Sequence, residues 1–137
     1  MRSAPRLAAR GLVVLAAVAV VALVARTEDR EADCRAAAAQ VFREITGSAA
    51  GSTVPAALRT LRSGDCPDSG PVVQAALNLA REGRVEEALP LARLVAREEP
   101  ENYGAWLVLA TALRERDPAG AAAARRRALA LDPLAGE

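Results

Sequence analysis

The sequence has no histidine and no lysine, and it holds one Phe, one Tyr and one Trp among 137 residues. The lack of histidine excludes a histidine-dependent hydrolase, a histidine-ligated zinc site and a haem with a histidine axial ligand. β-Branched and aromatic residues are scarce after the first 25 positions, which disfavours an antiparallel β-sandwich. The 18 arginines face 17 acidic residues and leave a net charge of +1, so no global field attracts nucleic acid.

Motifs for catalysis are also missing. The glycines form no phosphate-binding loop. Glu98 and Glu99 with Glu101 could be paired carboxylates, but such a run is more typical of a solvated helix end. Residues 125–127 are three arginines, which indicate either a patch for an anionic partner or an exposed helix face near a C-terminal end, where the helix dipole favours cations. We therefore predict a protein that is not an enzyme, with no cofactor and no metal.

A charge-free apolar run lies near the N-terminus. Residues 11–25 are 15 apolar positions between Arg10 and Arg26, and starting at Leu7 extends the run to 19 positions with one interior arginine. A membrane span needs about 20 residues and a signal-peptide core about 7–15, so the length lies between the two. Leu23 occupies the position where signal cleavage needs a small residue. We predict a retained signal-anchor, a transmembrane helix within residues 1–27 that contacts the membrane through 7–26.

Two other interpretations of this run stay open. A cleaved signal peptide would release a secreted protein, and a buried core helix would need no membrane. The orientation follows from arginines: Arg2, Arg6 and Arg10 precede the run, whereas arginines and acidic residues are mixed after it. The N-terminus is therefore expected in the cytoplasm and residues 27–137 outside it. That part carries 14 Arg against 17 acidic residues.

Cys34 and Cys66 are the only cysteines. An export signal with an even cysteine count favours a disulfide. The sequence predicts a helix from Arg30 to about Ile45 and another from about Val54 to Arg62, with Thr53 as N-cap and Pro55 in the first turn. In an antiparallel hairpin of these helices, the cysteines lie 11 residues before and 12 residues after the turn, at the same open end. Two unpaired thiols are the alternative; no histidine is present to activate either thiol.

Residues 70–133 carry an internal repeat. Pro100 and Pro133 are 33 residues apart, and each follows an apolar, alanine-rich segment of helical pattern. Small and large residues recur at matching places in the two halves. In the first half these are Ala76, Leu79, Gly83 and Ala88, and in the second half Trp106, Leu109, Ala110, Leu113, Ala121 and Ala128.

This pattern resembles the tetratricopeptide repeat, in which each unit is a pair of antiparallel helices and small residues let the two helices approach closely. Several features depart from the family pattern. Val72 replaces the usual aromatic residue, and Pro90 lies inside a helix, where it removes one backbone hydrogen bond. The second unit lacks the turn glycine and is one residue shorter there, with Asp117-Pro118 as N-cap and first helical residue. Asp68 or Ser69 and Asn102 are the other expected N-caps.

The resemblance implies a short α-α superhelical array, which follows the predicted transmembrane helix in an all-α fold. We divide the chain into the anchor (1–27), a helical hairpin that serves as a degenerate third repeat closed by the disulfide (28–67), and two helical pairs (68–137). The family pattern places a partner-binding groove on the first helix of each pair, made by Val73, Gln74, Leu77, Arg81, Leu107, Val108, Thr111 and Arg114. An apolar helix or extended segment would fit this groove; alternatively, the protein's own 30–46 helix fills it.

These features predict a membrane-anchored, extracytoplasmic scaffold or adaptor that mediates protein–protein interaction in a bacterial cell envelope. The complete preference for arginine over lysine and the 34 alanines favour a high-GC bacterium. The alternatives are a secreted, soluble binding module and a scaffold that faces the cytoplasm. We expect a protein partner and no nucleic acid, and the last helix has no polar cap after it, which leaves its outer face open to a second copy.

Overall fold

The computed structural model describes residues 4–47 and 54–136, with side chains described from 13 to 47 and from 54 to 134. Within these ranges the protein is all-α, as predicted, and contains no strand. The helices are α1 (Ala4–Ile45), α2 (Val54–Arg62), α3 (Gly70–Arg81), α4 (Val85–Glu98), α5 (Tyr103–Leu113) and α6 (Pro118–Leu131), followed by a short 3₁₀ turn (Pro133–Gly136).

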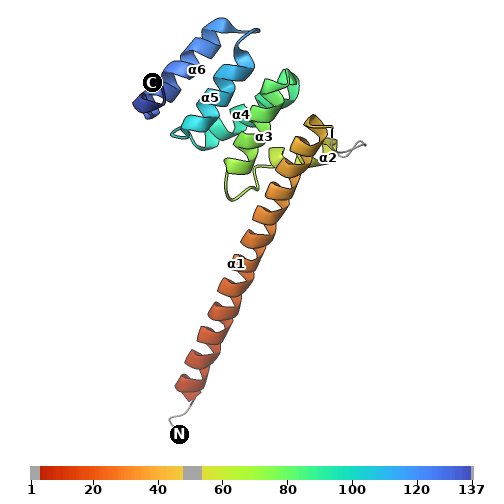
Figure 1. The fold of residues 1–137 in the computed structure, drawn as a ribbon. Coiled ribbons are helices and arrows are strands. Elements are labelled where there is room, and N and C mark those ends of the chain that lie inside the picture. Colours follow the sequence, from red (N-terminus) through yellow and green to blue (C-terminus); the bar gives the residue numbers. More distant parts are fainter. Residues whose placement is uncertain (1–3, 48–53, 137) are drawn as a thin grey trace.

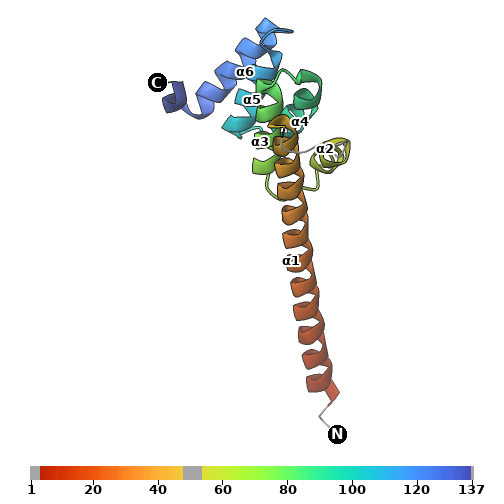
Figure 2. The same cartoon turned by 45° about the vertical axis from the view of Figure 1, so that its right-hand side comes forward.

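The helices stack as three successive pairs. α2 packs against the C-terminal part of α1, α4 against α3, and α6 against α5. The pairs are joined because α3 also contacts both α1 and α5, while α4 contacts α5 and α2. Figures 1 and 2 show the result as a row of helical hairpins at one end of a long helix. This arrangement is compatible with a helical repeat.

The second and third pairs keep the same register along the sequence. α3 and α5 begin at Gly70 and Tyr103, and α4 and α6 begin at Val85 and Pro118, so both starts are 33 positions apart. The expected one-residue shortening of the turn in the second repeat unit, between α5 and α6, is therefore wrong. α5 itself is one residue shorter than α3, with 11 residues against 12, and the following turn is one residue longer.

The two turns differ because only one contains glycine. Gly83 has a φ of +74°, in the left-handed region that favours glycine, and it lets the chain reverse in a short turn after α3. After α5 the backbone N–H groups of Arg116 and Asp117 donate to the carbonyl of Leu113, at 3.1 and 2.8 Å. Asp117 then caps α6 by accepting from the N–H of Gly120 at 2.9 Å. The turn without glycine thus needs one more residue to reach the same helix start.

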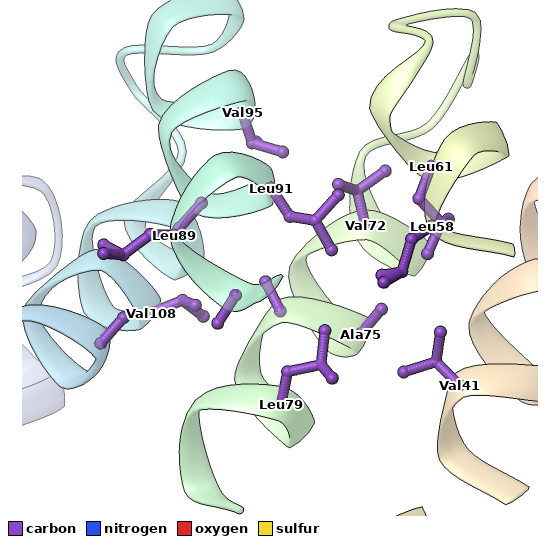
Figure 3. Packing of buried hydrophobic residues seen from close by; sticks show 14 of the residues in the cluster. Val41, Leu58, Leu61, Val72, Ala75, Leu79, Leu89, Leu91, Val95 and Val108 are labelled. Carbon is purple, nitrogen blue, oxygen red and sulfur yellow. The ribbon is translucent and has the colours of Figure 1, made fainter. Parts of the chain in front are cut away.

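The core consists of aliphatic residues, many of them alanine. Ala76, Ala88 and Ala128 are fully buried, at the positions where the sequence predicted small residues, and Ala121 is half-buried. No polar or charged side chain is buried among the described residues. Small side chains allow neighbouring helices to approach closely, and larger ones fill the space between them. Figure 3 labels these larger residues, among them Val41, Leu61, Leu79, Leu91 and Val108.

Two of the predicted N-caps have their expected hydrogen bonds. Asn102 accepts from the N–H of Ala105 at 3.2 Å, and Asp117 caps α6. Ser69 is the residue before α3 but makes no side-chain cap bond, and Asp68 instead accepts from the N–H of Gly70 at 2.9 Å. The predicted cap Thr53 lies outside the described residues. Pro90 is exposed within α4, on the side away from the core.

α1 is one continuous helix of 42 residues. The predicted separate helix from Arg30 is wrong at its start, because the chain remains helical across residues 27–30 with no glycine or proline to interrupt it. Its predicted end at Ile45 is confirmed. Gly47 follows with a φ of +73°, and its N–H donates to the carbonyl of Glu44 at 3.0 Å. The N-terminal part of α1 projects away from the hairpins in both views (Figures 1 and 2).

The predicted transmembrane helix is not found in the described part of the chain. There, no helix combines the length and the apolar character that crossing a membrane requires. The side chains of residues 7–12, where the expected span of 7–26 begins, lie outside the described ones.

Cys34 and Cys66 form the predicted disulfide. Their Cα atoms are 5.9 Å apart, and the bond closes a loop with a sequence separation of 32. Cys34 is buried on α1, and Cys66 lies half-buried in the segment after α2. The bond therefore fixes the open end of the first hairpin, as the spacing predicted.

Replacing Cys66 by serine is expected to lower the free energy of unfolding by about 3–4 kcal/mol, because the unfolded chain gains the entropy of a loop of this length. Denaturant unfolding followed by circular dichroism measures the loss. Adding a thiol reductant to the unmodified protein should give a similar loss, and the Cys66→Ser variant should not respond to it. Equal unfolding midpoints with and without reductant would contradict the stabilising role of the bond.

Candidate partner-binding site

The residues of the predicted groove are not gathered on one surface. Arg81, Leu107, Thr111 and Arg114 line hollows around α5, whereas Gln74 lines a separate hollow between α1 and α3. Val73 and Leu77 are half-buried and pack against the core. Val108 is only 1% exposed, so its assignment to the groove is wrong. It points into the cluster of buried aliphatic residues together with Leu89 (Figure 3).

The first hollow lies between α5 and α6, and we call it the α5–α6 hollow. It has a volume of about 370 Å³. Leu107 and Leu129 are half-buried in it, and the hydroxyl of Thr111 donates to the carbonyl of Leu107 at 2.9 Å. The lining comprises Tyr103, Leu107, Ala110, Thr111, Arg114, Ala121, Ala122, Arg125 and Leu129.

Two arginines border this otherwise apolar hollow. Arg114 is the C-cap residue that follows α5, Arg125 lies on α6, and both are exposed. Neither has a carboxylate partner among the residues that the structure describes. Both guanidinium groups are therefore free to bind an anion, and each offers up to five N–H donors.

A second hollow continues from the first along the end of α5. It has a volume of about 320 Å³ and shares Thr111 and Arg114 with the α5–α6 hollow. Arg81 and the α3–α4 turn form its other side, and Arg116 is paired there with Glu86. Four of the eight predicted groove residues thus lie on one continuous surface.

The hollow between α1 and α3 has a different character. Its volume is about 360 Å³, and Phe42, the only Phe in the chain, is 51% exposed at its side. Gln74 donates to Asn78 at 3.2 Å across one turn of α3. α1 packs against α3, yet Gln74 remains exposed. The protein's own helix therefore borders this part of the predicted groove without filling it.

Sequence reasoning missed several of these lining residues, including Phe42, Tyr103 and Leu129, and it considered Arg125 only as part of the arginine triplet, not of the groove. The register could have identified two of them. Arg125 and Leu129 lie 33 positions after Ala92 and Ala96, which are buried in α4. Phe42 carried no signal in the sequence, because a single aromatic residue in a helix is more often a core residue.

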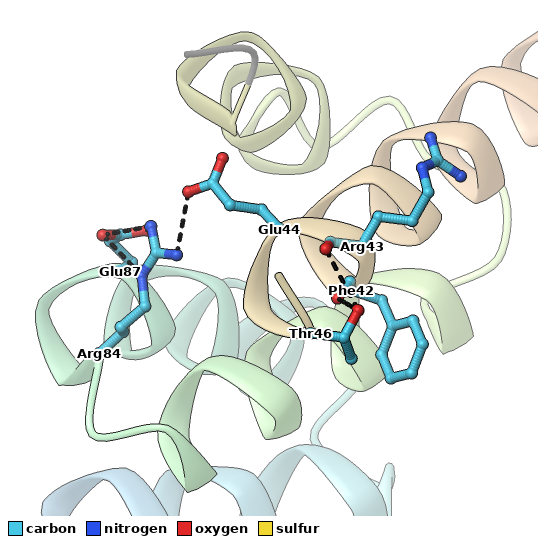
Figure 4. A network of polar contacts seen from close by, with 6 residues as sticks. All are labelled: Phe42, Arg43, Glu44, Thr46, Arg84 and Glu87. Atoms are coloured by element: carbon cyan, nitrogen blue, oxygen red, sulfur yellow. Dashed lines mark hydrogen bonds and ion pairs between the residues drawn. The ribbon is translucent and has the colours of Figure 1, made fainter. Parts of the chain in front are cut away.

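A polar network joins the first helical pair to the second. Arg84, in the α3–α4 turn, donates from Nη1 to Glu44 Oε1 at 3.2 Å and from Nη2 to Glu87 Oε2 at 2.7 Å. All three side chains are about one-third exposed, at 28 to 31%. Burial alone lowers the pKa of Arg84, but the hydrogen bonds and charges of Glu87 and Glu44 outweigh it and raise the pKa above its usual value. Arg84 therefore remains a cation, and Figure 4 shows it between the two carboxylates.

A second network joins the loops that precede α3 and α5. Ser69 donates to Glu99 Oε2 at 2.7 Å, and Asn102 Nδ2 donates to the same oxygen at 2.8 Å and to Ser69 Oγ at 3.0 Å. Trp106 Nε1 donates to the carbonyl of Pro100 at 2.9 Å. Glu99 thus helps to connect the second helical pair (α3 and α4) to the third (α5 and α6).

The three consecutive arginines of α6, residues 125–127, have different surroundings. Arg127 Nη2 lies 2.9 Å from Glu101 Oε1, so it links α6 to the loop before α5. Arg125 instead lines the α5–α6 hollow. In the described part of the chain, no three acidic, cysteine or histidine side chains are grouped as a metal site would require.

No protein family model, no curated protein and no solved structure matches this chain. The geometry by itself supports an all-α array of helical hairpins, pinned by one disulfide, with two unpaired arginines at the mainly apolar α5–α6 hollow, at the far end from the projecting helix.

Replacing Arg84 by methionine is expected to lower the free energy of unfolding by about 1–2 kcal/mol, because Glu44 and Glu87 lose a partner while partly shielded from water. Arg62→Met is the matched control, since Arg62 is exposed and has no ion-pair partner among the described residues. Chemical denaturation of both variants measures the difference. Equal losses in the two variants would show that the network does not hold the first pair to the second.

Proposed function

We propose that the protein is a non-catalytic scaffold, attached to a membrane by its N-terminal helix, whose helical pairs bind a protein partner. One observation carries this proposal: the apolar part of α1 is exposed on all sides. Its eight large aliphatic residues between Val13 and Val24 are each 51 to 70% exposed. Among the described side chains, Phe42 and Leu134 are the only other large hydrophobic residues that are at least half exposed.

The exposed surface favours a membrane as its environment. A helix that is apolar on every face is stable when it is surrounded by apolar material, either protein or lipid. No other described part of the chain covers this stretch, which projects from the hairpins (Figures 1 and 2). The sequence continues the run to Leu7, and Arg26 can extend its long side chain toward lipid headgroups.

The extracytoplasmic side is the favoured location of the hairpins. The arginines that precede the apolar run support a cytoplasmic N-terminus. The disulfide between Cys34 and Cys66 also favours an oxidising compartment, because cytosolic thiols are kept reduced. Together with the arginine and alanine bias, these features support a bacterial cell envelope. A secreted protein after cleavage and a scaffold that faces the cytoplasm are the alternatives.

The hairpins are proposed to be a tetratricopeptide-type array. The 33-residue register of the helix starts and the buried alanines at the expected positions support this interpretation. Arrays of this kind present an extended surface to other proteins, and the hollows around α5 offer such a surface here. The 28–67 hairpin takes the place of a third pair.

Replacing Val18 by aspartate is expected to weaken membrane attachment strongly, because a carboxylate at the middle of an inserted helix costs about 3 kcal/mol. Ala36→Asp is the matched control, since it adds the same charge to an exposed position of the same helix outside the apolar run. Flotation of the full-length protein with lipid vesicles measures attachment. If both variants float as well as the unmodified protein, or if none floats, the membrane proposal is wrong.

Labelling of intact cells with a membrane-impermeant maleimide tests the location of the hairpins. Labelling only after an external reductant, on full-length protein in the membrane fraction, is the expected result, since both cysteines are in the disulfide. Labelling of a shortened, released protein would favour the secreted alternative. Labelling only after the cells are broken, without reductant, would place the hairpins in the cytoplasm.

A further inference from the structure

We propose that the α5–α6 hollow is the docking site for a single helix of a partner protein, and that this helix presents a carboxylate between its apolar residues. The inference rests on the proposed scaffold function and specifies the class of partner. It follows from the register of the repeat, from the charges around the hollow and from the absence of a covering helix in the described chain.

The register shows what kind of element fits the hollow. Four residues of α4 that are buried in the core, namely Ala88, Leu89, Ala92 and Ala96, are at most 8% exposed. The residues 33 positions later are Ala121, Ala122, Arg125 and Leu129, and all four line the α5–α6 hollow. α4 and α6 have the same length of 14 residues. The α6 residues that line the hollow are thus the counterparts, one repeat unit further along, of α4 residues that are buried in the core.

A helix covers the corresponding surface of the second pair, because α5 packs against both α3 and α4. In the first pair, α3 packs against α1 and α4 packs against α2. Only the short turn Pro133–Gly136 follows α6 in the described chain, and it contacts α6. The last pair therefore presents a half-buried apolar surface, which includes Leu107 and Leu129. A helix covers the equivalent surface of the preceding pair, but no described helix covers this one.

The charges indicate which helix would bind. One of the four matching positions differs in charge between the two helices. It is the buried Ala92 in α4 and Arg125 in α6. Arg125 and Arg114 border the same hollow and have no carboxylate partner among the described residues. A copy of α5 would leave both cations unpaired, since α5 has no acidic residue. A partner helix with a Glu or Asp at this place would pair with them in a partly desolvated setting.

The same charges argue against a second copy of the chain on this surface. In a two-fold dimer the same surface of each subunit meets its own copy. Arg114 and Arg125 would then meet a copy of the hollow, whose lining holds two arginines and no acidic residue. Like charges at a closed interface are unfavourable, so a different protein with a complementary charge is the better occupant.

A designed peptide tests this proposal on the full-length protein in detergent. The probe is a stapled helix of about 15 residues, stapled because free helices of this length are marginal in water. It carries Leu and Ala on one face and Glu at the edge of that face, and a second peptide has Gln in place of Glu. Fluorescence anisotropy of the labelled peptides measures their affinities. Binding of the Glu peptide roughly tenfold or more tightly than the Gln peptide is expected.

Variants of α6 locate the binding. Arg125→Ala restores the residue type found at position 92, and it should reduce the preference for the Glu peptide several-fold while the Gln peptide binds as before. Leu129→Gln should weaken both peptides by a similar factor. Arg126→Ala is the matched control, because Arg126 is an exposed neighbour on the same helix that does not line the hollow.

Several results would overturn the inference. These are the absence of peptide binding, equal affinity for the two peptides, or equal effects of Arg125→Ala and Arg126→Ala. A dimer in analytical ultracentrifugation that Leu129→Gln dissociates would assign the surface to a second copy instead. Vesicle flotation does not depend on the hollow, so the membrane part of the proposed function succeeds or fails independently of the peptide result.

Discussion

The close approach of neighbouring helices at alanine residues is the constraint on which the rest of the structure depends. Ala75, Ala76, Ala88 and Ala105 have no exposed surface, and a larger side chain at such a crossing would push the helices apart or force neighbours out of their rotamers. Close packing gives many weak contacts with few bulky residues. It also explains how a chain with three aromatic residues can form a continuous core.

A core made of small side chains buries less apolar surface per residue, so connections between the pairs carry more weight. The disulfide fixes the start of the first hairpin, and Arg84 links its far end to the second pair through Glu44. Glu99 and Asn102 connect the loops before α3 and α5. These contacts lie at the ends of the helices, where backbone groups also need partners. These polar contacts thus connect the helix ends of neighbouring pairs, while the aliphatic residues between the helices form the core.

The sequence allowed the helices from Val54 onward to be predicted well, because their signals are local. Proline at the first turn and the caps Asn102 and Asp117 each act within a few residues, and the 33-residue register repeats the pattern along the chain. The disulfide could also be predicted, since the spacing of its cysteines from one turn is symmetrical. It was harder to predict which face of each helix is buried. Leu107 and Val108 are adjacent on α5, yet only Val108 is in the core. Which face is covered depends on the crossing angle of α5 on α3 and α4, and no local pattern encodes that angle.

The unbroken path of α1 has a mechanical consequence. No glycine or proline lies between Arg26 and Ile45, so the helix has no hinge where it leaves the apolar stretch. From Arg26 to the buried Cys34 the helix rises about 12 Å, and beyond Cys34 it packs against α2 and α3. A lipid bilayer around the apolar stretch would fix the height of the array above its surface, and the tilt of the helix would fix the direction in which α5 and α6 face. The protein would then behave as a rigid bracket, which accepts only partners whose own geometry brings them to that height.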